Sequence, residues 1–355
     1  MADQPALTYL GMTRPVINPF GSDTVKECET SDRAPLEFDP IEHLRFIPPA
    51  RILTMADISL PDDTGISPTA VSEPFPLFST EAIVEMRREV FSDGTWMNCG
   101  YSSNIAACQL RGMAPKYASF VYNAWKHPRT LAILSQIAGI ELVPSMDYEI
   151  GHINVSVKKP RNAAEGPPPP ESTKPIVDWH TDSYPFVCVL MMSDTTTMVG
   201  GETALRTGTG EVIKVHGPQM GSAVVLQGRY IKHQALAAFG ADERITMVTS
   251  FRPRSAFVAD DTTLSNVRPV SDLSELYHQF SEYRVEIIEE RVRQQLKDIR
   301  DARRAKNKIN LKSLKGWLTE QIEFLEHTRG ELVDERDVTK GHVGSAFPVS
   351  AIKKT

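Results

Sequence analysis

The chain has 355 residues, of which 41% are hydrophobic and 24% charged, so it can bury a large core and need not be disordered; this excludes a short, disulfide-stapled scaffold. Its formal net charge of −6, from 39 Lys and Arg against 45 Asp and Glu, argues against a nucleic-acid partner and favours a small-molecule substrate. The four cysteines are widely spaced and no apolar run approaches the roughly 18 residues of a membrane span, so we expect reduced thiols, no membrane partner and a cytoplasmic location.

The N-terminal part of the chain is expected to support the core. Residues 1–78 are rich in Pro, Asp and Ser, and predict an arm that wraps around the rest of the protein. Residues 79–145 are predicted to form helices that support the core. One helix covers residues 79–90, and a second helical region over residues 116–138 is split or kinked by Pro128.

The hydrophobic pattern changes to a period of two between residues 146 and 255, which is typical of β-strands. Strand-like runs separated by Gly- and Pro-rich breaks cover residues 148–157, 186–192, 211–215, 223–226 and 245–251. No long amphipathic helix lies between these runs, so a parallel βαβ sheet is excluded. The pattern predicts an antiparallel core, either a sandwich or a small barrel.

Two helices are predicted after the core, within residues 270–330, from apolar side chains spaced three and four apart. Their apolar faces include Val292, Leu296 and Ile299 in the first helix and Leu311, Leu314, Leu318, Ile322 and Leu325 in the second. Residues 284–315 hold eleven Lys and Arg against five Asp and Glu. Either an anionic partner or an ordinary solvated helix face would explain this surplus of positive charge.

The tail, residues 338–355, carries apolar side chains that a free terminus would not need. Val343 and Phe347 are two of them, and burying each is worth about 1.5 to 3 kcal/mol, so we expect the tail to dock. It would form either a seam against the helical arm or a lid that shapes the substrate pocket.

The segment Asp178-Trp179-His180-Thr181-Asp182 is the first candidate for chemistry. Residues two apart on a strand point to the same face, so His180 and Asp182 could hold one ion together. His233 follows His180 by 53 residues, far enough for a returning strand to bring it alongside. Two His and one carboxylate on one face of a metal are the ligands of non-haem Fe(II) oxygenases. His216 is a weaker third ligand, because it ends a short strand only 36 residues after His180.

A second candidate site, for a carboxylate ligand, begins eleven residues after His233. Arg244 and Thr246 are two apart on a predicted strand and therefore share a face. A guanidinium fork beside a hydroxyl binds a carboxylate. The alternative for Arg244 is an ion pair with Asp242 or Glu243.

Further polar residues on strands are candidates for the substrate pocket. His152, Asn154 and Ser156 share one face of a core strand, and inward-facing polar side chains require partners. A packed, hydrogen-bonded histidine is the alternative for His152. Arg252 is the next candidate after Arg244 for contact with a carboxylate.

The order of these candidate residues resembles the HxD…H…R-x-S/T pattern of the Fe(II)/2-oxoglutarate-dependent oxygenases over residues 146–254. The residues that match this pattern are His180, Asp182, His233, Arg244 and Thr246. Thr replaces the commoner Ser and keeps the hydroxyl. The Gly-Gly of residues 199–203 also looks like a hairpin turn of this family. The resemblance implies an α+β protein with a double-stranded β-helix (jelly-roll, cupin-like) core, an N-terminal arm, flanking helices and a C-terminal helical pair in a single oxygenase domain.

The resemblance also implies the ligands and the reaction. Fe(II) would bind His180, Asp182 and His233, and 2-oxoglutarate would place its distal carboxylate on Arg244 and Thr246. Reaction with O2, with ascorbate as an optional auxiliary, would give succinate, CO2 and a ferryl oxidant that abstracts hydrogen from a small molecule. The outcome would be hydroxylation, desaturation or ring closure. Halogenation is disfavoured, because halogenases of this family lack the carboxylate that Asp182 supplies.

Two further segments, FPLFSTEAI and SDLSELYHQFSEYR, resemble a group of fungal secondary-metabolism oxygenases that includes an aziridine-forming amino-acid oxygenase of tryptoquialanine pathways. This likeness implies an amino-acid-like substrate. The alternative function is a cupin-like metal or small-molecule binding protein without oxygenase activity. Zinc-assisted hydrolysis is disfavoured, because no general base is identifiable. The sequence makes no prediction of oligomeric state.

Overall fold

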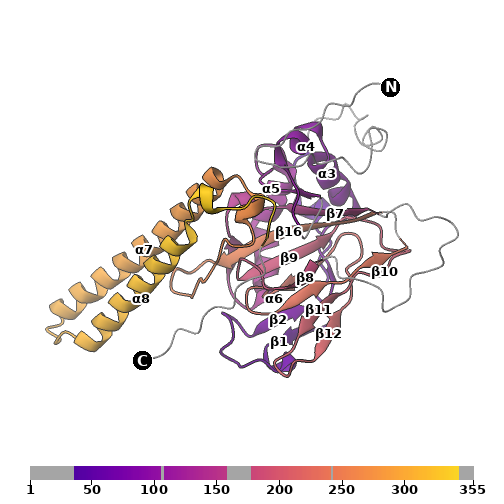
Figure 1. Cartoon of the computed structure of the whole chain (residues 1–355). Helices are drawn as coiled ribbons and strands as arrows, with labels where there is room; N and C mark the ends of the chain where they lie inside the picture. The colour runs from indigo at the N-terminus through magenta and orange to yellow at the C-terminus, as the bar shows by residue number, and fades with distance from the viewer. Residues whose placement is uncertain (1–35, 105–107, 158–176, 241–242, 344–355) are drawn as a thin grey trace.

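A large antiparallel sheet, a smaller sheet and two groups of helices make up the protein (Figure 1). The computed structural model describes residues 36–104, 108–157, 177–240 and 243–343. Residues 160–175, which contain four consecutive prolines at positions 167–170, lie outside these residues. Every strand pair within them is antiparallel, so the predicted α+β class with an antiparallel core is confirmed.

The large sheet contains ten strands from the described residues. They are β1 (Ile52–Thr54), β2 (Thr69–Ser72), β3 (Phe75–Pro76), β4 (Gly100–Tyr101), β5 (Gln109–Leu110), β6 (Leu142–Pro144), β7 (His152–Val157), β9 (Phe186–Met191), β13 (Ser222–Leu226) and β16 (Glu243–Pro253). The order is β1-β2-β13-β9-β16-β7-β5-β4, with β3 beside β13 and β6 beside β16. The sheet therefore takes in strands from the N-terminal arm and from the helical region, which the sequence analysis did not place in it.

The small sheet has the order β12-β11-β14-β8. Its strands are β8 (Val177–His180), β11 (Thr203–Arg206), β12 (Val212–Val215) and β14 (His233–Ala235), and a separate pair joins β10 (Val199–Gly200) to β15 (Ala238–Phe239). From β7 to β16 the chain passes repeatedly between the two sheets. The predicted Gly-Gly hairpin is wrong, because β10 pairs with β15 and not with β11.

Successive side chains along a strand of the large sheet point to opposite faces and pack in two different hydrophobic cores. On β13, Ala223 and Val225 pack among the helices, whereas Val224 and Leu226 pack against side chains of the small sheet. This alternation is the period of two in the sequence, and it gives the large sheet two buried faces. Polar residues on the face toward the small sheet therefore line the space between the sheets.

The helices that cover the outer face begin and end at local signals. They are α2 (Pro40–His43), α3 (Thr80–Val90), α4 (Asp93–Cys99), α5 (Ser119–Lys126) and α6 (Pro128–Ala138), with 3-10 turns at Ala56–Ile58, Asp147–Glu149, Arg268–Val270 and Glu335–Asp337. The Ser79 hydroxyl caps α3 by accepting the N–H of Ala82. Pro128 begins α6, and Gly139 ends it at φ 70°, so the predicted split of the second helical region is confirmed.

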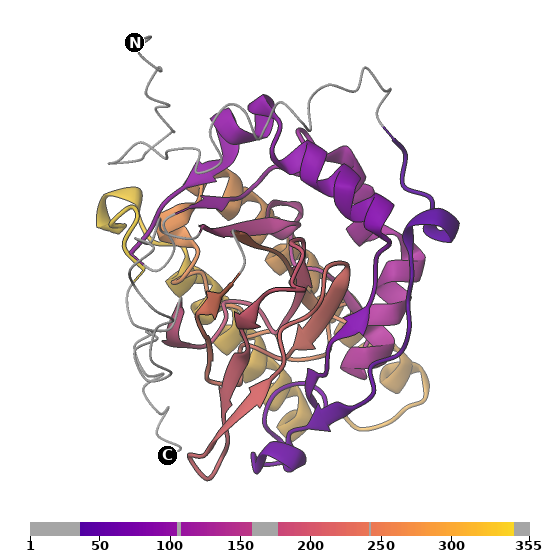
Figure 2. The ribbon, with the colours of Figure 1, turned by 90° about the vertical axis from the view of Figure 1, so that its right-hand side faces the viewer.

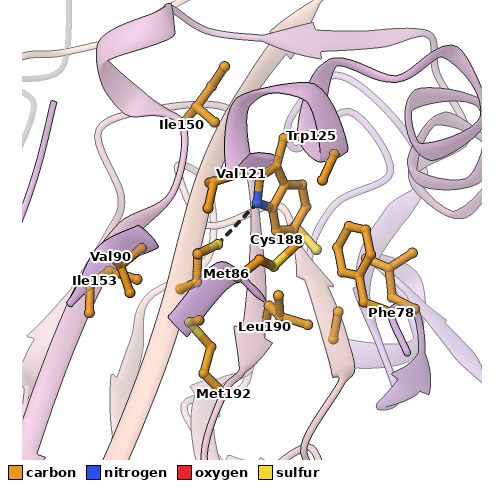
Figure 3. Packing of buried hydrophobic residues seen from close by; sticks show 14 of the residues in the cluster. Phe78, Met86, Val90, Val121, Trp125, Ile150, Ile153, Cys188, Leu190 and Met192 are labelled. Atoms are coloured by element: carbon orange, nitrogen blue, oxygen red, sulfur yellow. Dashed lines mark hydrogen bonds between the residues drawn. The ribbon is translucent and has the colours of Figure 1, made fainter. Parts of the chain in front are cut away.

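Aromatic side chains fill the space between these helices and the large sheet. Trp125 of α5 is fully buried and donates its indole N–H to the Met247 sulfur at 3.1 Å (Figure 3).

Figure 2 shows residues 36–78 passing these helices on the way to the edge of the sheet. The strand predicted from residue 148 starts only at His152, because Asp147–Glu149 forms a 3-10 turn.

A long helical hairpin, α7 (Leu273–Arg304) and α8 (Leu311–Glu331), extends away from the sheets (Figure 1). The base of α7 is buried by side chains such as Leu276 and Phe280. Further along, Val292, Leu296 and Ile299 are exposed, and so are most of the apolar positions predicted for α8. The helices are confirmed, but within the described residues these apolar faces lack a partner. None of the described helices is both long and apolar enough to cross a bilayer.

Candidate metal centre

Three side chains from two separate segments of the sequence meet at one end of the small sheet. His180 ends β8, Asp182 follows two residues later, and His233 begins β14 directly opposite His180. One potential ligand atom from each lies within 4.8 Å of the others. The His180 Nε2 atom is 3.6 Å from Asp182 Oδ1, and the His233 Nε2 atom is 3.5 Å from Asp182 Oδ2.

The backbone orients both imidazoles toward the carboxylate. His180 donates its Nδ1–H to the Asp178 carbonyl at 2.7 Å, and His233 donates its Nδ1–H to the Ile231 carbonyl at 2.9 Å. A carbonyl can only accept, so these bonds place a proton on Nδ1 and leave both Nε2 atoms as metal ligands. His216, the weaker sequence candidate, is exposed and is not in this group.

Charge balance at the group favours a cation. Burial raises the pKa of Asp182, but the neighbouring imidazole of His233 and that of His180 outweigh burial, and the pKa stays well below its ordinary value. Burial lowers the pKa of His233, while the Asp182 charge outweighs it and raises that pKa. Asp182 Oδ2 is buried and has no hydrogen-bond partner among the described residues. A buried carboxylate oxygen of this kind, with two Nε2 atoms aimed at it, fits a divalent transition metal.

Gly228 provides the space that Asp182 occupies. The Asp182 N–H donates to the Gly228 carbonyl at 2.9 Å, and a Cβ at residue 228 would lie 1.8 Å from Asp182 Oδ2. We therefore expect Gly228→Ala to displace the carboxylate and weaken metal binding about 10- to 100-fold, the range seen when the support of a metal ligand is removed. Titration with Fe(II) under nitrogen measures this. Gly316→Ala, at an exposed glycine with open space around its Cβ position, is the control, and equal affinities in the two variants would contradict the prediction.

Arg244 lies on β16, and none of the residues that the structure describes forms an ion pair with its guanidinium. Its backbone position is opposite Ser156, and Thr246 is opposite Asn154. The Arg244 Nε atom is buried without a hydrogen-bond partner among the described residues, and burial alone lowers the Arg244 pKa. The predicted alternative of an ion pair with Glu243 is wrong, because Glu243 pairs with Arg87 at 2.8 Å; Asp242 lies outside the described residues.

The Arg244 side chain reaches Gly201, between β10 and β11. Its Nε atom lies 3.5 Å from the point that a Cβ of Gly201 would occupy, and residue 201 precedes the strand that pairs with β14. Thr246, on the same face of β16, is 3% exposed. Arg244 is half-buried, its Nε atom is fully buried, and it has no anionic partner among the described residues, so this arrangement suits an anionic ligand between the sheets.

The polar face of β7 lies beside β16 and is half-buried. His152, Asn154 and Ser156 alternate with Ile153 and Val155, which are buried on the helix side of the sheet. His152 and Asn154 thus face the space between the sheets, as the sequence analysis expected of inward polar residues.

Gln109 and Arg111, which the sequence analysis missed, contact this face. The Gln109 amide nitrogen lies 3.2 Å from His152 Nε2 and 3.1 Å from Asn154 Oδ1. An Arg111 N–H donates to His152 Nδ1 at 3.2 Å, and Arg111 also forms a buried ion pair with Glu149. Burial, and secondarily the Arg111 charge, holds the His152 pKa well below its ordinary value, so His152 is neutral.

The remaining sequence candidates lie elsewhere. Arg252 packs its guanidinium on the Tyr283 ring at 4.7 Å, and it is eight residues from Arg244, about 27 Å along an extended strand. Val343 is buried, and its N–H and carbonyl bond the Asn104 side chain at 2.8 and 3.0 Å. Phe347 lies outside the described residues.

Comparison with known proteins gives low similarity. No protein-family model and no curated protein matches the chain. Among solved structures it is similar to an oxidoreductase of the 2OG-Fe(II) oxygenase family from Burkholderia pseudomallei, with 15% identity over 43% of this chain and 71% of that chain and a TM-score of 0.32. It is also similar to a Pseudomonas putida prolyl-4-hydroxylase (16% identity, 50% and 88% covered, TM-score 0.33). A third is SnoN, a non-heme alpha ketoglutarate dependent epimerase from nogalamycin biosynthesis (15% identity, 50% and 73% covered, TM-score 0.37).

Proposed function

We propose that the protein is an Fe(II)- and 2-oxoglutarate-dependent oxygenase that acts on a small molecule. The observation that carries this proposal is the pairing of a three-ligand metal group with Arg244 on the neighbouring sheet, whose Nε atom is buried and has no hydrogen-bond partner among the described residues. The alternation of the chain between two antiparallel sheets from β7 to β16 supports the proposed double-stranded β-helix.

Each part of the site has a role in this proposal. His180, Asp182 and His233 would hold the iron, and Arg244 with the Thr246 hydroxyl would bind the distal carboxylate of 2-oxoglutarate. Bound iron, with 2-oxoglutarate and O2, supplies C–H oxidation and yields succinate and CO2. The protein orients the two carboxylates of the cosubstrate and shields Arg244 from water, which strengthens the ion pair.

A metal-binding protein without oxygenase activity is the alternative. Such a protein would use the same three ligands but would have no use for the buried guanidinium of Arg244. Halogenation is disfavoured, because Asp182 stands with both histidines in the metal group.

Anaerobic addition of Fe(II) and 2-oxoglutarate tests the proposal directly. We expect a visible metal-to-ligand absorption band that needs both additions, followed by succinate release when O2 and a substrate from an amino-acid screen are supplied. A protein that binds iron but gives neither the band nor succinate would favour the alternative. Mass analysis of the product distinguishes hydroxylation from desaturation and ring closure.

The polar face of β7 is the proposed substrate contact. His152→Leu removes a neutral imidazole that Gln109 and Arg111 hold in place, so we expect the substrate KM to rise about tenfold, the effect of one lost hydrogen bond with a partner left unpaired. The 2-oxoglutarate KM should not change. His278→Leu, at an exposed histidine of α7, is the control. A change in both KM values would instead indicate that His152 supports the whole site.

The C-terminal tail is proposed to close the site. Val343 bonds the Asn104 side chain, and Asn104 lies five residues before Gln109, which contacts His152 and Asn154. We expect truncation before Lys340 to leave folding and iron binding intact while 2-oxoglutarate is consumed without substrate oxidation. The ratio of succinate to product measures this coupling. Full coupling in a folded truncation would contradict the lid and favour a structural seam.

A further inference from the structure

The hairpin of α7 and α8 carries an apolar surface that no described residue covers. Its side chains are between 38% and 64% exposed and come from both helices: Val285, Val292, Leu296 and Ile299 of α7, and Leu311, Leu318, Ile322 and Leu325 of α8. We call this set the hairpin face. Monomeric proteins rarely expose so many large apolar side chains in one contiguous surface.

Both halves of the hairpin face lie on the same side of the hairpin. Arg284 and Arg291 of α7 pack on the Phe324 ring of α8, with guanidinium carbons 3.6 and 4.5 Å from its centroid, so these residues mark where the helices meet. Val285 and Val292 each follow one of these arginines, and a helix turns about 100° per residue. They therefore point sideways from the contact between the helices.

On α8, Leu325 follows Phe324 and therefore also points about 100° away from the contact between the two helices. Because the helices run antiparallel, equal rotations bring the two apolar stripes to one side. The residues that join α7 to the rest of the protein, such as Leu276 and Phe280, lie on the opposite side of α7. The hairpin face is thus directed away from the side of α7 that packs on the rest of the protein, and no residue in the described ranges covers it.

Charge is distributed unevenly along the hairpin. The tip, residues 297–315, holds eight Lys and Arg against two Asp and Glu. The base, residues 282–290 and 320–326 together, holds seven Glu against one Arg, and that Arg is the buried Arg284. The positive surplus noted in the sequence is therefore confined to one end, and an equal negative surplus lies at the other.

We propose that the hairpin face is a dimerisation surface that pairs with the same face of a second copy of this chain. A two-fold axis near Val292 and Leu318 would set the hairpins antiparallel in a four-helix bundle. Each basic tip then meets the acidic base of the partner, and Arg300 lies near the partner's Glu286. A parallel arrangement would place like charges together, so the charge pattern selects the antiparallel pair.

The available surface is sufficient for a stable dimer. From residue 282 to the end of α7 the hairpin is roughly 33 Å long and 20 Å wide, so pairing covers roughly 1,300 Å² in total, within the range of specific interfaces. This inference is independent of the proposed oxygenase activity.

Sedimentation of the full chain tests the proposal. We expect a species of twice 39.5 kDa at micromolar concentration. The double variant Val292→Glu with Leu318→Glu should weaken association at least 100-fold and leave the melting temperature of the monomer unchanged. Val84→Glu, at an exposed valine of α3, is the matched control and should remain dimeric. A monomeric wild type, whether or not it binds anionic vesicles, would overturn the proposal, and so would a dimer that the double variant leaves intact.

Charge exchange tests the antiparallel arrangement. Arg300→Glu alone and Glu286→Lys alone should each weaken the dimer, because each sets like charges together in a homodimer. An equimolar mixture of the two variants should restore it, since a mixed dimer contains two opposite-charge pairs. A mixture that associates no better than the separate variants would overturn the arrangement.

Discussion

Replacing Asp182 by alanine is expected to abolish stoichiometric Fe(II) binding and to reduce 2-oxoglutarate turnover below detection. The carboxylate lies between two imidazoles, 3.6 and 3.5 Å from their Nε2 atoms, and contributes the one negative charge of the group. Without it, two neutral nitrogens remain to hold a divalent cation, and the ligand set is incomplete. Metal content after gel filtration and succinate release measure the two losses. Alanine at His180 or His233 should act in the same way.

Asp178 provides the matched control for this experiment. It belongs to the same five-residue segment, but its side chain is exposed and bonds its neighbour's backbone, the Trp179 N–H, at 2.7 Å. Its backbone carbonyl, which orients His180, is unchanged in Asp178→Ala. We expect this variant to retain iron and turnover. If Asp182→Ala also retained both, the assignment of the metal ligands would be wrong.

Replacing Arg244 by leucine is expected to raise the KM for 2-oxoglutarate by about 10- to 150-fold while iron binding stays unchanged. A charge-assisted hydrogen bond in a buried site contributes about 1.5 to 3 kcal/mol, which corresponds to this range. Arg244→Lys keeps the charge but loses the planar fork, so its effect should be intermediate. Thr246→Val removes one hydroxyl and should have a smaller effect.

Arg252→Leu is the control for the cosubstrate site. Arg252 lies on the same strand and also has a buried Nε without a partner among the described residues, but it packs on Tyr283 at the far end of β16. We expect its 2-oxoglutarate KM to match the wild type. A larger effect at Arg252 than at Arg244 would move the carboxylate site to the other end of the strand.

Local sequence determined most of the secondary structure. The start of one helix at Ser79, the break at Pro128 and the end of the next helix before Gly139 depend on residues within one helical turn, so composition and spacing were sufficient to predict these boundaries. The period of two likewise predicted β9, β13 and most of β16, since alternation follows from the geometry of a single strand. The order of polar residues in the sequence was also enough to name His180, Asp182 and His233 as one group.

Only the tertiary structure showed what surrounds these residues. The contact of Asp182 with Gly228, and of His152 with Gln109 and Arg111, joins segments more than 40 residues apart. No local pattern encodes such a contact, because it depends on how the returning strands pair.

In the C-terminal hairpin, too, local sequence determined the helices, and the tertiary structure determined what surrounds them. Apolar spacing of three and four predicted both helices and their apolar faces, because a periodic stripe is a property of one helix. The identity of the surface that covers such a stripe depends on where the rest of the chain lies. The described part of the chain covers the base of α7 and leaves the hairpin face exposed, and this is decided by the docking of α7 on Tyr148 of the 3-10 turn and on loop residues such as Tyr184 and Ala256.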